Sequence, residues 1–149
     1  MVSTEEFVRH YYDDSDFRTY ADSKLQLLLP LMEAFAREIG AEIPLDYKNE
    51  RDPTNLTLVW QDGEMNRNIR VMAAVKGKEL CVAVWANVYR DERPSRQRHA
   101  VRYKRGSFED NAYIVPPESI EFRTALTRVH QDAISIRRED LSGPYQLRR

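Results

Sequence analysis

Residues 90–105 form the segment whose side chains are best suited to binding chemistry. Seven of these sixteen residues are arginine or lysine, and only Asp91 and Glu92 are acidic. A basic stripe of this kind can follow the phosphates of a nucleic acid, while neighbouring aromatic rings stack on its bases. The predicted binding residues, for a nucleic acid or for another partner, are Arg96, Arg98, His99, Arg102, Tyr103, Lys104 and Arg105.

A charged strand at the edge of a sheet is the alternative interpretation of the same segment. Lys and Arg side chains on an edge strand prevent it from pairing with other molecules. The sequence pI of about 6.3 favours this alternative, because nucleic-acid-binding domains typically have a pI above ~9. Single-stranded nucleic-acid binding through residues 96–105 is therefore the second functional hypothesis and not the first.

Three aspartates, Asp13, Asp14 and Asp16, are the candidates for a catalytic or metal-binding cluster. Clustered carboxylates bind hard cations, but the Gly and Glu of an EF-hand loop are missing at the required spacing. Short acidic side chains are also common where one helix ends and the next begins. We therefore expect an acidic turn between two helices and no bound metal.

The glycine and histidine patterns argue against the common cofactor-binding classes. The five glycines are widely separated, so the chain has neither a P-loop nor a G-x-G-x-x-G motif. His10, His99 and His130 are too far apart in the sequence for a local metal motif. We expect no cofactor, and an enzyme would need a site assembled from distant residues, such as His99 or the 13–16 cluster.

Cys81 is the only cysteine, so no intrachain disulfide can form. It lies within an apolar run, which is typical of a cysteine buried in a core. The first sixteen residues are acidic and do not resemble a secretory signal, and the longest apolar run, residues 27–32, is far shorter than the ~18 residues of a membrane span. The expected location is the cytoplasm, without membrane contact.

Hydrophobic spacing predicts helices at both ends of the chain. A capping box at residues 3–6 predicts a short helix from about Thr4 to Tyr12. A longer helix is expected to be capped by Ser15 or Asp16 and to end at Gly40, with Pro30 either bending it or starting a new helix. A C-terminal helix is expected to reach about Asp140, although residues 133–136 also fit an edge strand.

The period changes from 3.6 to 2 in the middle of the chain, which predicts an antiparallel meander of four strands. Turn residues at 62–63 and 76–78 separate the first three strands, and residues 97–105 form the fourth. Residues 80–89 are apolar on both faces, as expected of a central strand that is covered on both sides. A further short strand is expected at residues 112–115.

Met72, Trp85 and Tyr89 are predicted to form an apolar patch on one face of this sheet. Large exposed apolar patches are unusual in monomers, so the patch needs a cover. The C-terminal helix and a partner chain, which includes a second copy, are the two alternatives for that cover.

Charge is unevenly distributed, with a net of −6 over residues 1–75 and +5 over residues 76–149. Such asymmetry marks a basic partner-binding face, unless the two halves neutralise each other in the folded chain. The sequence predicts one α+β domain over residues 1–149, with N-terminal helices, a four-stranded antiparallel meander and a C-terminal helix. The first functional hypothesis is a non-catalytic binding or interaction module, an oligomer or a subunit of a larger assembly; single-stranded nucleic-acid binding is second and a small enzyme third.

Overall fold

The computed structural model describes residues 2–92, 97–99 and 111–141, with side chains described outside 90–92 and 97–99. Five of the predicted binding residues, Arg96, Arg102, Tyr103, Lys104 and Arg105, therefore lie outside the described residues. The order of elements confirms the predicted α+β layout, with two N-terminal helices, an antiparallel sheet and a C-terminal helix.

Two helices open the chain after a two-residue strand, β1 (Val2–Ser3), which the sequence did not predict. The first helix, α1, is Thr4–Asp13, and the Ser3 half of its predicted capping box is confirmed because the Glu6 amide donates to Ser3 Oγ at 3.0 Å. The second, α2, is Ser15–Ile39 and runs through Pro30 as one helix, with Gly40 at its end in the left-handed conformation, φ 72°. That conformation favours glycine, which has no Cβ to clash.

The cap of α2 is one residue earlier than predicted. Asp14, and neither Ser15 nor Asp16, holds the first turn, because Asp14 Oδ1 accepts from the amides of Asp16 at 3.0 Å and Phe17 at 3.1 Å. An extended residue with a short carboxylate is well suited to this position. The acidic turn predicted between the two helices is therefore confirmed.

Three long strands form the predicted hairpins of the sheet. They are β2 (Asn55–Asp62), β3 (Met65–Lys76) and β4 (Glu79–Glu92), paired antiparallel in chain order. Gly63 and Gly77 make the two tight turns at φ values of 61° and 65°. β1 continues the β2 edge of β3, while β5 (Gln97–His99) and β6 (Tyr113–Val115) both pair with β4 on its other edge.

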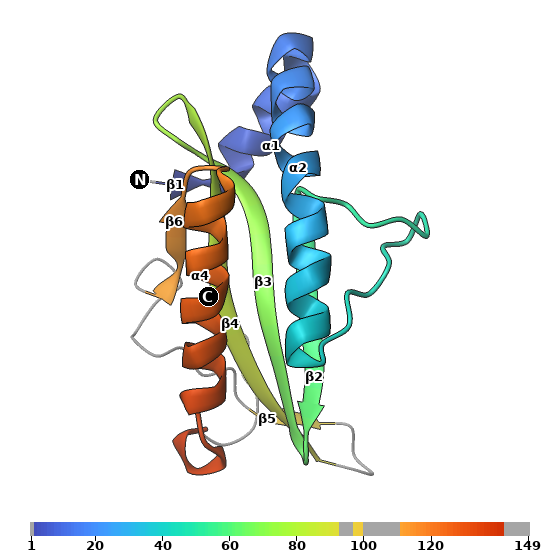
Figure 1. The fold of residues 1–149 in the computed structure, drawn as a ribbon, viewed down its shortest axis with the longest axis vertical. Coiled ribbons are helices and arrows are strands. Elements are labelled where there is room, and N and C mark those ends of the chain that lie inside the picture. The colour runs from blue at the N-terminus through green and yellow to red at the C-terminus, as the bar shows by residue number, and fades with distance from the viewer. Residues whose placement is uncertain (1, 93–96, 100–110, 142–149) are drawn as a thin grey trace.

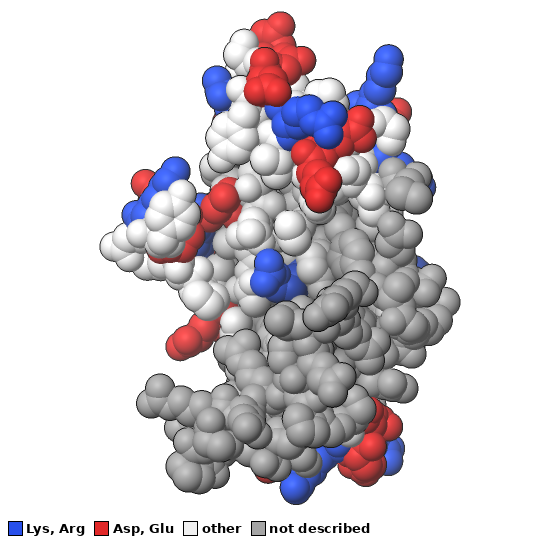
Figure 2. Space-filling model, turned by 180° about the vertical axis from the view of Figure 1, so that it is seen from behind, with Lys and Arg blue, Asp and Glu red and all other residues white. Residues whose placement is uncertain are grey.

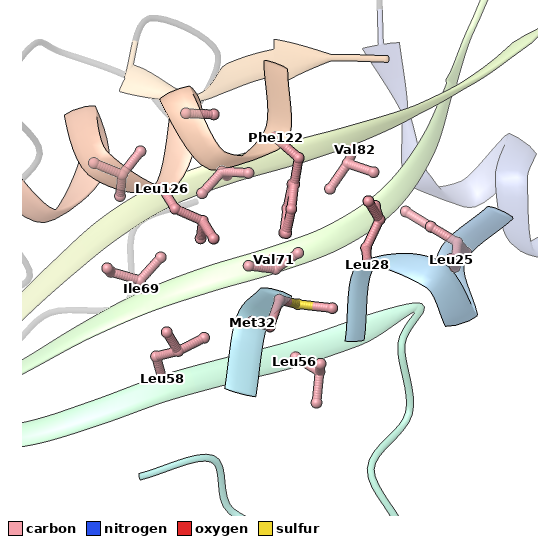
Figure 3. Packing of buried hydrophobic residues seen from close by; sticks show 14 of the residues in the cluster. Leu25, Leu28, Met32, Leu56, Leu58, Ile69, Val71, Val82, Phe122 and Leu126 are labelled. Atoms are coloured by element: carbon pink, nitrogen blue, oxygen red, sulfur yellow. The ribbon is translucent and has the colours of Figure 1, made fainter. Parts of the chain in front are cut away.

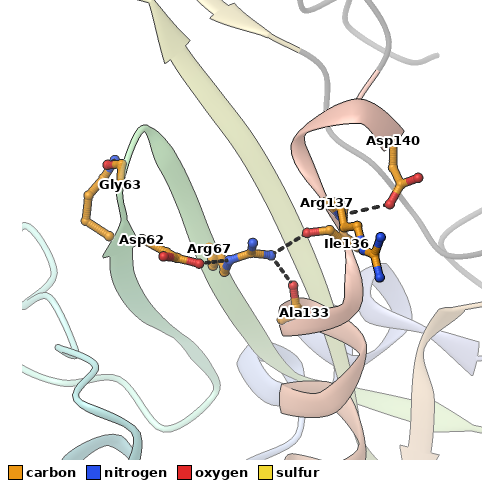
Figure 4. Close-up of polar contacts among 8 residues, drawn as sticks. Asp62, Gly63, Arg67, Ala133, Ile136, Arg137 and Asp140 are labelled. Carbon is orange, nitrogen blue, oxygen red and sulfur yellow. Dashed lines mark hydrogen bonds and ion pairs between the residues drawn. The ribbon is translucent and has the colours of Figure 1, made fainter.

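The last helix, α4 (Ser119–Ser135), is shorter than predicted, because residues 136–137 are extended before a 3₁₀ turn, Arg138–Asp140. The strand alternative for residues 133–136 is wrong, since Ala133–Ser135 are helical. Arg67 Nη1 donates to the carbonyl oxygens of Ala133 and Ile136, the latter at 2.7 Å, and so supplies donors where the helix stops (Figure 4). A helix end leaves such carbonyls without intrahelical partners.

Both long helices, α2 and α4, lie side by side on one face of the sheet (Figure 1). Leu25, Leu28 and Met32 of α2 meet Phe122 and Leu126 of α4 over alternate residues of the strands (Figure 3). The strand residues of this core include Leu58, Ile69, Val71, Val82 and Val84, each at most 1% exposed. Burial of this quality is the main stabilising contribution to the fold.

The opposite face of the sheet, here the second face, is formed by the intervening residues of β3 and β4. The strand register places these side chains together: Asn66, Asn68, Arg70, Met72, Ala74, Lys76, Glu79, Cys81, Ala83, Trp85, Asn87 and Tyr89. Because α4 packs on the other face, the alternative in which the C-terminal helix covers Trp85 is wrong. Figure 2 views the molecule from this side, where the described acidic and basic side chains are intermixed at the end that carries α1 and the start of α2.

No helix in the described ranges is long and apolar enough to cross a membrane.

Candidate functional site

Asn68 of β3 and Asn87 of β4 are direct partners across the middle of the second face. Only 6% of Asn68 and 7% of Asn87 is exposed. Both side-chain Oδ1 atoms are buried without a hydrogen-bond partner. A buried polar atom of this kind costs about 1–3 kcal/mol, so two of them on adjacent strands make this pair a candidate site for another group.

The orientation of the Asn68 amide follows from a chain of hydrogen bonds that begins at a backbone carbonyl. Gln61 Nε2 donates to the Gly63 carbonyl oxygen at 3.0 Å, which leaves Gln61 Oε1 to accept from Asn66 Nδ2 at 3.4 Å. Asn66 Oδ1 then accepts from Asn68 Nδ2 at 3.2 Å. Since a carbonyl can only accept, each amide in the chain has one allowed orientation. Asn68 Oδ1 is therefore the acceptor that remains.

Arg70 lies in the next cross-strand pair on the same face, opposite Trp85. Its Nη2 donates to Asn55 Oδ1 at 3.1 Å, and its guanidinium carbon lies 5.9 Å from the centre of the Trp85 ring. Its Nε is buried and has no hydrogen-bond partner. The second face thus contains two buried acceptors and one buried cationic donor in two adjacent cross-strand pairs, so it is not purely apolar.

The three predicted patch residues share this face, but they do not form an exposed apolar patch. Trp85 is only 7% exposed, and Met72 and Tyr89 are half-buried. The patch was proposed from strand alternation, which assigns a side chain to a face but not to solvent.

The basic segment joins the sheet where the sequence placed it, as far as the structure describes it. In β5 the backbone of Arg98 pairs with Asp91 and that of His99 pairs with Arg90. This confirms that residues 97–99 lie beside β4. The role of Arg98 and His99 in binding stays a prediction.

Sequence reasoning did not select Asn68, Arg70 or Asn87 as candidate site residues. The sequence did contain a signal for these residues. β3 and β4 are apolar over most of their length, but Asn68, Arg70 and Asn87 are polar residues inside them. Buried polar residues inside central strands are rare and usually have partners.

A separate cleft of about 400 Å³ lies between α1, α2 and the loop that precedes β2. Within it, Tyr11 donates from its hydroxyl to Asp22 Oδ1 at 2.7 Å. Burial, the hydrogen bond to Asp22 and the negative charges of Asp22 and Asp52 raise the pKa of Tyr11 to about 12. Its phenol is therefore a firmly held donor at neutral pH and not a general base.

Two further titratable groups, His130 and Cys81, have shifted pKa values. Burial lowers the pKa of His130, whose ring lies 5.5 Å from Trp60 and 5.9 Å from Phe35. Burial raises the pKa of Cys81, as expected of the predicted core cysteine. No group of three or more His, Cys, Asp or Glu side chains capable of holding a metal occurs among the described residues.

Ion pairs join the acidic and basic halves of the chain. Arg123 lies 3.2 Å from Glu38, and Arg138 lies 2.7 Å from Glu64. These pairs are exposed, so each contributes little to stability. They do show that part of the charge asymmetry is neutralised within the chain.

The fold and the candidate site together define an α+β protein with one helix-covered face of its sheet and a second face that presents buried polar groups. Comparison of the chain with protein-family models, with curated proteins and with solved structures found no match in any of the three.

Proposed function

We propose that this chain is a non-catalytic binding module whose binding surface is the second face of the sheet. The observation that carries the proposal is the pair of buried, unpartnered Oδ1 atoms of Asn68 and Asn87. Both long helices occupy the other face, so neither α2 nor α4 covers the pair. The lone buried Cys81 fits a reducing compartment, and we place the module in the cytoplasm.

A protein, which includes a second copy of the chain, is the first partner that we consider. Light scattering at increasing concentration measures self-association directly, against a monomer mass of 17.6 kDa. Tyr89→Asp, on the second face, should return an oligomer to this mass. The matched control is Tyr20→Asp on the solvent side of α2, where Tyr20 is 45% exposed, and it should leave the mass of the assembly unchanged. A monomer at all concentrations removes self-association.

Single-stranded nucleic acid is the second candidate partner, and the pairing of β5 with β4 favours it, because that pairing brings the start of the basic segment to the edge of the second face. Sheets that bind single strands combine aromatic and amide side chains with nearby arginines. Affinity for a single-stranded 12-mer should fall steeply with salt, and Arg98, Arg102 and Lys104 to Ala should weaken it further. An absence of binding at low salt would end this candidate.

A further inference from the structure

We propose that the Asn68–Asn87 pair receives the exocyclic amino group of a nucleobase, with Arg70 Nε donating to an acceptor of the same nucleotide. The inference rests on the proposed function, because it assigns a ligand class to the second face.

The two amide oxygens determine which kind of group can complete the site. Asn68 Oδ1 is fixed as an acceptor by the amide chain that starts at the Gly63 carbonyl, and Asn87 Oδ1 is the acceptor opposite it. Side chains that face each other across an antiparallel pair have Cβ atoms about 5 Å apart. One group with two N–H bonds can therefore reach both oxygens, and an amino group is such a donor.

The charges near the pair indicate whether the donor is a neutral amino group or an ammonium group. Among the second-face residues of β3 and β4 whose side chains are described, the acidic one is Glu79, at the far end of the hairpin from Asn87, whereas Arg70 supplies a positive charge in the adjacent cross-strand pair. An ammonium buried beside a guanidinium and without a carboxylate would be strongly disfavoured. The aromatic amino group of adenine, cytosine or guanine is neutral and meets both conditions.

Arg70 supplies the other half of the recognition. Its Nη2 is already bound to Asn55 Oδ1, while its buried Nε is an unpaired donor. It lies two residues from Asn68 along β3, about 7 Å at the rise of a strand. A nucleotide carries acceptors on its ring, sugar and phosphate, and its planar base suits the neighbouring Trp85–Arg70 stack.

Titration calorimetry with matched nucleotides tests the amino group itself. AMP and CMP carry the exocyclic amino group, whereas IMP and UMP carry a carbonyl oxygen at the same ring position. AMP or CMP should bind at least about tenfold more tightly than its matched partner. Equal affinity within both pairs, or no binding of any nucleotide or of the oligonucleotides below at millimolar concentration, overturns the inference.

Two oligonucleotides identify the source of the base. If an oligo(dA) 12-mer binds far more tightly than AMP, and more tightly than oligo(dT), the natural ligand is a single strand. If AMP binds as tightly as oligo(dA), the natural ligand is a free nucleotide. Both results support the amino-group assignment. Tighter binding of oligo(dT), which has no amino group, overturns it.

Two variants and one structure determination connect the binding to the site. Asn87→Leu and Asn68→Leu should each weaken AMP or CMP binding at least about tenfold and leave IMP and UMP unaffected, with circular dichroism confirming the fold. A crystal structure of the free chain in which a rotated Asn87 donates Nδ2 to Asn68 Oδ1 overturns the inference. If nucleotides fail to bind while Asn87→Leu disrupts self-association, the nucleobase assignment is wrong and the binding face proposed above still stands.

Discussion

Arg67 of β3 donates from Nη1 to the carbonyl oxygen of Ala133 in the last turn of α4. The same nitrogen reaches the carbonyl of Ile136, and Nε pairs with Asp62 Oδ2 at 3.1 Å (Figure 4). Only 6% of Arg67 is exposed. One buried cation thus joins the turn after β2 to the end of the C-terminal helix, which lies far away in the sequence.

Replacement of Arg67 by Met should lower the free energy of unfolding by about 3 kcal/mol, because two helix-end carbonyls lose a charged donor in a buried site. Urea denaturation measures the change. Arg123→Met is the matched control, since Arg123 pairs with Glu38 on the surface with 53% of its side chain exposed, and it should cost less than about 1 kcal/mol. Equal costs for the two variants would show that the Arg67 contacts contribute nothing beyond a surface pair.

Two neighbouring leucines of α2 test the assignment of its buried stripe. Leu28 is 1% exposed and Leu27 is 70% exposed. Leu28→Ala should destabilise the protein by about 2–5 kcal/mol through lost burial and the cavity that remains. Leu27→Ala should change stability by less than about 0.5 kcal/mol. Thermal or urea unfolding of both variants measures the difference, and a costly Leu27 substitution would place an unrecognised contact on that side of the helix.

The helices and hairpins could be predicted because each follows from local patterns. Apolar residues at intervals of three and four, from Leu25 to Ile39, predicted α2, and the glycines at 63 and 77 predicted the turns. The end of α4 could not be predicted in this way. It depends on Arg67, which comes more than sixty residues earlier and reaches the helix only in the folded chain.

The candidate site was predictable only in part, and for a similar reason. Alternation placed Trp85 and Tyr89 on the second face, but burial of Trp85 depends on tertiary packing. The importance of Asn68 comes from an amide chain that links β2, β3 and the turn between them, and no sequence pattern specifies such a network. Asp14 was missed as the cap of α2 because three neighbouring residues all have side chains that can cap.

The phenol of Tyr11 should ionise near pH 12, later than an ordinary tyrosine, because burial and the bond to Asp22 favour its protonated form. Since the folded chain holds this proton more tightly than the unfolded chain, the stabilisation is complete below pH 10 and is lost as the pH rises toward 12. When tyrosine ionisation is followed by ultraviolet absorbance, the Tyr11→Phe variant should lack the ionisation that occurs at the highest pH. Tyr12→Phe, at an exposed neighbour, is the control and should retain it.

His130 has a lowered pKa, in contrast to the raised pKa of Tyr11, and should make the folded protein less stable at acidic pH. Burial against Phe35 and Trp60 lowers its pKa, so the folded chain binds the proton less tightly than the unfolded chain. Its neutral form supports stability above pH 6.5, and this support is lost as the pH falls through the lowered pKa. His130→Gln should flatten the loss of stability between pH 7 and pH 5, measured by denaturation at each pH.

Replacement of Asn87 by Leu should leave the free protein as stable as the wild type or stabilise it by about 1 kcal/mol. The reason is that the substitution removes a buried oxygen without a partner and keeps the number and branching of the side-chain heavy atoms. Binding residues that are poorly satisfied in the free state commonly trade stability for function. Asn55→Leu is the matched control and should destabilise the protein by about 1 kcal/mol, because Asn55 Oδ1 accepts the hydrogen bond from Arg70. Denaturation in urea measures both variants. If Asn87→Leu costs more than about 1 kcal/mol, the amide is satisfied in the free protein and the case for a ligand at this position fails.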